Sequence, residues 1–154
     1  MSTTGLDVFD TTVHKTNNWL NELMQLLIWD DKRRAYRALR ETLHALRDRL
    51  PIDEVAQLGA QLPMLIRGFY YEEWDPTGKP LRVRHADEFL AQIETRLQGD
   101  YPIDAEEIAR AVFTLLSERI SDGEIDDVKQ VLPAELRSLW PVDAVGAGVR
   151  AGPA

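Results

Sequence analysis

The chain has 154 residues, a formal net charge of −8 at pH 7 and no cysteine. The missing cysteines exclude disulfides, thiolate zinc sites and cysteine nucleophiles, and the acidic balance argues against nucleic acid as the default partner, because phosphate binding favours a basic surface. No run of 18 apolar residues could span a membrane and the N-terminus lacks a signal-peptide pattern, so we expect one compact cytoplasmic domain.

An internal repeat predicts the fold class. The sequence aligns with itself at an offset of 70 residues, so that 16–70 match 86–140 without a gap, and eleven of the 55 pairs are identical. We predict an all-α domain over 1–140, built from two tandem four-helix repeats, about 11–71 and 86–140, with pseudo-two-fold symmetry. Helices shorter than about 12–15 residues are marginal in isolation, so each copy is expected to bury the open face of the other.

In the first copy, helices are expected at 11–28, 32–49, 53–61 and 63–71. Asp10 is the predicted N-cap of the first helix. Its apolar stripe recurs at spacings of three and four, through Phe9, Val13, Thr16, Leu20, Leu23 and Leu27. Pro51 ends the second helix, because the residue before a proline is pushed out of the α region. Pro63 opens the fourth, where its missing N–H costs nothing.

Between the copies, residues 72–85 have no helical pattern and contain the turn-forming run Asp75–Pro80. We expect an irregular or hairpin-like connector there. The helices of the second copy are predicted at 86–98, 104–120, 122–131 and 133–140. Gly99 is a predicted C-cap, and two pairs have capping-box spacing, namely Asp104 with Glu107 and Ser121 with Glu124. The residues from 141 to 154 are expected to form a flexible tail.

The two copies differ in charge. Residues 32–49 contain seven basic and two acidic side chains, whereas the aligned residues 102–119 contain two basic and four acidic ones. Arg33, Arg37 and Arg40 share one helix face and could hold a phosphate. A salt-bridged, solvated face is the favoured interpretation. A third interpretation is attraction to the acidic helix around Glu106 and Glu107, within one chain or between protomers.

Aromatic residues gather at the end of the first copy, at Phe69, Tyr70, Tyr71 and Trp74. Tyr70 aligns with Trp140, so this position is predicted to lie in the core. Tyr71 and Trp74 have no such counterpart. They are predicted either to pack at the edge of the core or to form a binding surface.

No metal site is predicted. Residues 121–127 resemble a calcium loop, but with Gly123 at the sixth position the third and twelfth positions are Ile120 and Lys129, which cannot provide oxygen ligands. The histidines are His14, His44 and His85. His44 has a ligand-type neighbour at helical spacing, Asp48, but two ligands are too few for zinc.

Catalytic motifs are absent as well. Serine and threonine residues occur without a neighbouring histidine base, and no glycine-rich phosphate loop is present. We therefore predict that the protein is not an enzyme and has no catalytic residues, cofactor or metal.

The segments Leu62–Pro63, Gly68–Pro76 and Leu132–Trp140 resemble those of a bacterial family, the domain of unknown function numbered 2267. The resemblance extends from about Val13 to Trp140. It implies a duplicated helical domain, and it implies no activity or catalytic residue.

These observations lead to three functional hypotheses. The first is a non-enzymatic protein-interaction or accessory domain, acting as a homo-oligomer or with a protein partner, whose candidate surface residues are Arg33, Arg37, Arg40, Tyr71 and Trp74. The alternative is small-molecule binding in the crevice between the two copies. Nucleic-acid or anion binding by the basic start of the second helix is the least favoured.

Overall fold

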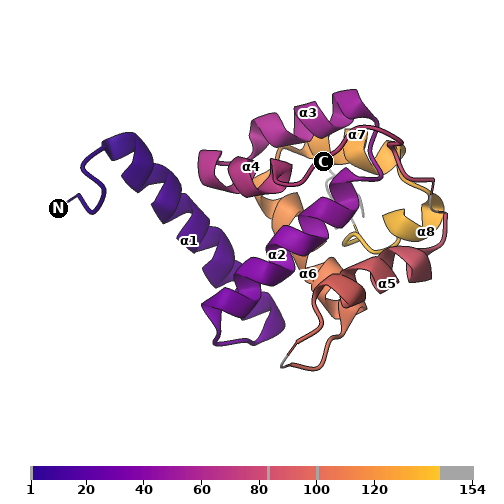
Figure 1. Cartoon of the computed structure of the whole chain (residues 1–154), viewed down its shortest axis with the longest axis horizontal. Helices are drawn as coiled ribbons and strands as arrows, with labels where there is room; N and C mark the ends of the chain where they lie inside the picture. Colours follow the sequence, from indigo (N-terminus) through magenta and orange to yellow (C-terminus); the bar gives the residue numbers. More distant parts are fainter. Residues whose placement is uncertain (1, 83, 100, 143–154) are drawn as a thin grey trace, which may run out of the picture.

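The computed structural model describes residues 2–82, 84–99 and 101–142. These residues form eight α-helices and no strand, which confirms the prediction of an all-α bundle (Figure 1). The helices are α1 (Asp7–Leu27), α2 (Lys32–Arg47), α3 (Ile52–Gln61), α4 (Met64–Tyr71), α5 (Ala86–Arg96), α6 (Ala105–Arg119), α7 (Asp122–Gln130) and α8 (Ala134–Arg137). The pseudo-two-fold relation between the two copies stays a prediction.

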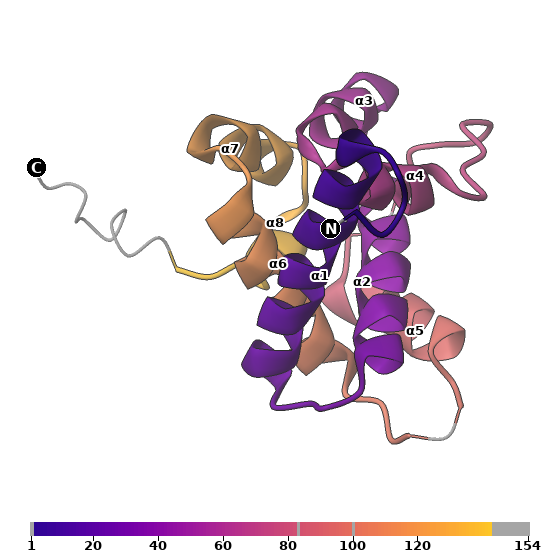
Figure 2. The same cartoon turned by 90° about the vertical axis from the view of Figure 1, so that its left-hand side faces the viewer.

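Helix α2 lies at the centre and packs against α1, α4, α5 and α6. Figure 2 shows α1 and α2 running side by side, while α3 and α7 lie together at one end of the bundle. The N-terminal part of α1 extends away from the other helices (Figure 1). One continuous buried cluster includes side chains from both halves of the chain, among them Leu23, Leu39, Phe89 and Phe113.

Side chains cap the free backbone amides at the start of several helices. Asp31 accepts from the Arg33 and Arg34 amides at the start of α2, and Asp104 accepts from the Glu107 amide at 3.0 Å, which is one of the two bonds of the box predicted for α6. The box predicted for α7 is also half formed. Ser121 accepts from the Glu124 amide at 3.3 Å, but the Ser121 amide donates to Gln61 instead of Glu124.

Two predicted helix ends are wrong. Helix α1 begins at Asp7 with Leu6 as its N-cap, because the Asp10 carboxylate accepts from the Thr4 amide and hydroxyl at 3.0 and 2.8 Å and folds the preceding turn onto the helix. Helix α5 ends at Arg96, and Leu97, not Gly99, is its C-cap.

The later segments are less regular than predicted. Helix α8 ends at Arg137, before the expected residue 140. Residues 72–85, as far as they are described, form an irregular connector without a hairpin, and the Leu81 amide donates to the Asp48 carbonyl at 2.8 Å. The predicted flexible tail falls mainly on 143–154, outside the described residues.

Helix α2 fixes the end of α4. His44 donates from Nε2 to the Phe69 carbonyl at 2.6 Å, and Arg47 Nη1 donates to the carbonyls of Tyr70 and Glu72 at 2.6 and 2.9 Å. The last carbonyls of a helix have no partner within it, so these bonds satisfy them and hold α4 in place.

Arginines seventy positions apart have the same local role. Arg67 donates to the carbonyls of Gly59 and Leu62, both at 2.8 Å, at the end of α3. Arg137 donates to the Leu132 carbonyl at 2.8 Å, just after α7. Both arginines therefore satisfy carbonyls at helix C-termini. Among the described residues, no helix is both long and apolar enough to cross a bilayer.

Candidate functional site

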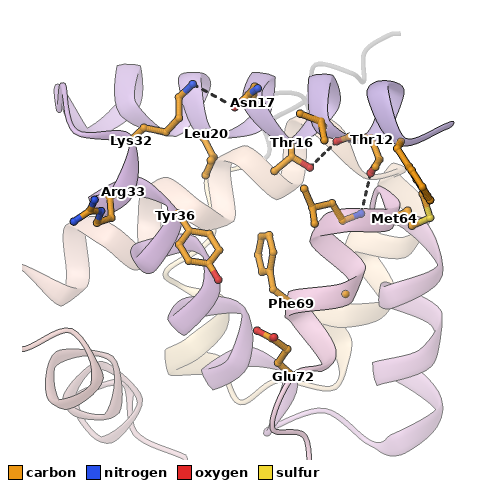
Figure 3. Close-up of a pocket in the computed structure, with 14 residues that line it drawn as sticks. Thr12, Thr16, Asn17, Leu20, Lys32, Arg33, Tyr36, Met64, Phe69 and Glu72 are labelled. Carbon is orange, nitrogen blue, oxygen red and sulfur yellow. Dashed lines mark hydrogen bonds between the residues drawn. The ribbon is translucent and has the colours of Figure 1, made fainter. Parts of the chain in front are cut away.

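A groove of about 900 Å³ lies between α1, α2 and α4 (Figure 3). All of its lining residues come from the first half of the chain. They are Phe9, Thr12, Val13, Thr16, Asn17, Leu20, Lys32, Arg33, Tyr36, Met64, Leu65, Gly68, Phe69 and Glu72. We call this feature the apolar groove.

The α1 wall is the exposed part of the predicted apolar stripe. Phe9 and Val13 are 47% and 41% exposed, and Leu6, one turn earlier, is 52% exposed. Leu20 and Leu23 continue the stripe and are buried. The periodicity is thus continuous, but only its C-terminal part is covered by other helices.

The α4 wall faces this row. Met64 and Leu65 are each 43% exposed, and a Cβ added at Gly68 would meet no atom within 4 Å. Between the walls the rings of Tyr36 and Phe69 pack edge to face at 5.2 Å.

Polar atoms at the junction of α1 and α4 are already satisfied. The Leu65 amide donates to Thr12 Oγ1 at 2.8 Å, and Thr16 Oγ1 donates to the Thr12 carbonyl at 2.8 Å. The groove therefore offers mainly apolar surface, and its binding energy would come from burial.

The rim is charged at one end. Lys32 and Arg33 lie where α2 begins (Figure 3). Lys32 Nζ donates to Asn17 Oδ1 at 3.2 Å, whereas the Arg33 guanidinium makes no hydrogen bond or ion pair with the described residues. Glu72, on the α4 side, already pairs with Arg40. This end of the groove is therefore positively charged and would attract an anionic group.

The three predicted arginines have different neighbours. Arg33 lines the apolar groove. Arg37 donates to the Arg96 carbonyl at 3.4 Å. Arg40 forms ion pairs with Glu41, Glu72 and Glu73, at 2.6, 3.2 and 3.6 Å.

Tyr71 and Trp74 are half-buried and pack against the core outside the apolar groove. The Tyr71 ring lies 4.9 Å from Tyr70 and 5.7 Å from Trp74. Tyr70 and Trp140 are both buried, as predicted for that aligned pair.

The histidines lie apart from one another. Burial lowers the pKa of His44, so its neutral ring donates to Phe69. His85 lies 3.1 Å from Glu135, and this hydrogen bond raises its pKa. His14 is exposed beside Asn18. Within the part of the chain that the structure describes, no group of three His, Cys, Asp or Glu residues could hold a metal ion.

A second constellation was missed by sequence reasoning. Glu54 and Glu124, one of the identical aligned pairs, are 7% and 6% exposed in the first turns of α3 and α7. Burial first, and then a hydrogen bond with Glu124, raises the pKa of Glu54 to about 8. With a pKa of about 8, the Glu54 carboxyl keeps its proton at neutral pH, which avoids placing two negative charges side by side. Because both carboxyls are buried, this site favours retention of the proton over contact with a substrate.

The crevice between the two copies is lined mainly by polar and charged residues. An open groove of about 490 Å³ lies between α1 and α6, where Arg119 donates twice to Glu22 Oε1 at 2.9 and 2.6 Å. A second gap, of about 20 Å³, contains Arg34 stacked over Trp29 and Tyr101, at 3.7 and 4.4 Å from the ring centroids.

These features define an all-helical domain with an apolar groove between three of its helices. The family model described as "Uncharacterized conserved protein (DUF2267)" matches residues 16–139, so the chain belongs to this family. The resemblance found in the sequence is confirmed. No curated protein matches the chain. Phe9, Thr12 and Val13, which form one wall of the groove, precede the matched segment.

Proposed function

We propose that this protein is a non-enzymatic interaction domain, working in the cytoplasm, and that its apolar groove binds an amphipathic helix. The observation that supports the proposal is the exposure of large apolar side chains on both walls. Covering the exposed part of Phe9 or Val13 would contribute about 1 kcal/mol each. A helix laid in a groove is a recurrent mode of peptide recognition.

The shape and charge of the groove define the occupant. The groove runs along α1, so a helix with apolar residues at spacings of three, four and seven would follow it. Lys32 and Arg33 would attract acidic side chains at one end of that helix. Charges at a rim contribute orientation and specificity more than affinity.

The test is site-specific photo-crosslinking in cells that express the chain, with a photoreactive amino acid at Leu65. We expect a discrete polypeptide adduct, identified by mass spectrometry, that disappears when Phe9→Glu is added. Because Phe9 is half-exposed, this substitution should leave thermal unfolding unchanged. The control is the same photoreactive residue at Gln57, which is exposed on α3 outside the groove.

Two results would overturn this proposal. One is the absence of any polypeptide adduct at Leu65. The other is an identical set of adducts at Leu65 and Gln57, which would show that the capture does not depend on the groove.

Small-molecule binding between the two copies and anion binding by Arg33, Arg37 and Arg40 stay predictions. A thermal-shift screen tests the first, since a ligand at 100 times its Kd adds about 2.7 kcal/mol. Salt-dependent retention on heparin, lost on Arg33→Glu with Arg37→Glu, tests the second.

A further inference from the structure

We propose that the helix bound in the apolar groove is α1 of a second copy of this chain, so that two molecules form a symmetric dimer. This inference rests on the proposed function and names the partner of the same site.

The N-terminal part of α1 has the properties that the groove selects. Leu6, Phe9 and Val13 form an exposed apolar row at spacings of three and four. Asp7 and Asp10 place acidic groups in the first turns of the same helix, and Asp10 also accepts hydrogen bonds from Ser2 and Thr4. This part of α1 also extends away from the bundle, where a second molecule can reach it (Figure 1). The groove and its occupant are therefore present on one chain.

Charge complementarity sets the orientation. Along α1, the groove extends from Phe9 to Leu20, with Lys32 and Arg33 at the Leu20 end (Figure 3). If a second α1 lies antiparallel with the two-fold axis near Val13, its acidic start falls beside Lys32 and Arg33. In a parallel arrangement the two acidic ends would lie together and repel.

The antiparallel arrangement also gives a closed dimer. Asp10 and Asn17 are about 10 Å apart along α1, because an α-helix rises about 1.5 Å per residue. Asn17 lies beside Lys32, so this is the distance between the acidic start and the basic end of the groove. A two-fold axis at Val13 brings each acidic start to the basic end of the other molecule. The same patch is then used twice, which is an isologous interface that stops at two copies.

The first test is a charge swap, measured by sedimentation equilibrium of the full chain. Asp7→Lys with Asp10→Lys should raise the dimer Kd about tenfold or more, and so should Lys32→Glu with Arg33→Glu. An equimolar mixture of the two variants should restore dimerisation, because each contact in the mixed dimer again joins opposite charges. Arg82→Glu with Arg84→Glu, exposed positions outside the groove, is the matched control and should leave the Kd unchanged.

The second test uses the lack of cysteine in the natural chain. Val13→Cys, near the proposed axis, should form a disulfide-linked dimer under mild oxidation. Val131→Cys, at a valine with almost the same exposure (42% against 41%), should not.

The outcomes separate this inference from the proposed function. A monomeric wild-type chain, or variants that stay monomeric when mixed, would overturn the dimer. If crosslinking at Leu65 then captures a different protein, the interaction domain stands and only its partner changes. If Leu65 captures no polypeptide, both proposals fail.

Discussion

Glu54 and Glu124 show how one pair of side chains makes stability depend on pH. Both carboxyls are buried between α3 and α7, and burial and their mutual hydrogen bond raise the pKa of Glu54 from 4.5 to about 8. Asp53 and Asp127 raise it further through their negative charge, and the buried Tyr70 hydroxyl lies near both carboxyls. The folded protein therefore binds a proton that the unfolded chain releases near pH 4.5.

The sign of the pH dependence follows from this raised pKa. The contribution of the Glu54 proton to the free energy of unfolding is complete below about pH 4.5 and is lost as the pH rises through about 8. Between these values the free energy of unfolding falls by at most about 1.4 kcal/mol per pH unit. Glu54→Gln should flatten this dependence, because its amide can donate to Glu124 at every pH. Urea unfolding at pH 5, 6.5 and 8 measures the effect.

The control is Glu107→Gln, the same chemical change on the exposed face of α6. It should leave the pH profile of the wild type intact. A Glu54→Gln profile as steep as the wild-type one would show that the pKa of Glu54 is not the source of the pH dependence.

At the scale of the helices, Arg67 and Arg137 stabilise the ends of α3 and α7. Hydrogen bonds from a charged donor contribute about 1.5–3 kcal/mol. Arg67→Met, which keeps the aliphatic stem, should lower the free energy of unfolding by an amount in this range. Arg137→Met should cost less, because Arg137 is exposed whereas Arg67 is half-buried.

Chemical denaturation of the two variants measures this difference, with Arg82→Met as the control in the connector. Equal and negligible losses for both variants would mean that water satisfies these carbonyls as well as the guanidinium does.

The helices show which parts of the fold the sequence predicts. Their existence and order follow from periodicity and proline positions, since both are local properties. The ends at Asp10 and Gly99 were wrong because other contacts decided them. Asp10 accepts from Thr4 in the turn before the helix, and the Arg37 guanidinium of α2 donates to the Arg96 carbonyl where α5 ends. The groove was missed because Phe9 and Val13 belong to the same stripe as the buried Leu23. A periodic stripe does not show how far along a helix the other elements extend.

At the scale of the whole molecule, the two halves share one core. The buried cluster is continuous across them, and the Glu22–Arg119 and Glu41–Arg96 pairs join them at the surface. We expect one cooperative unfolding transition, with coincident curves from circular dichroism and from tryptophan fluorescence.

A fragment of residues 1–78 should not fold alone, because Leu39 and Leu43, completely buried in the chain, would lose part of their cover. Circular dichroism of the fragment tests this. A cooperative, fully helical fragment would show two independent units instead.

The pair of Glu54 and Glu124 also changes the net charge of the folded molecule. The formal charge of −8 counts both Glu54 and Glu124 as ionised at pH 7. A retained proton makes the folded molecule one unit less negative, whereas the unfolded chain has the full formal value. Electrophoretic mobility near neutral pH should therefore differ between the folded and unfolded protein by more than the change in size explains.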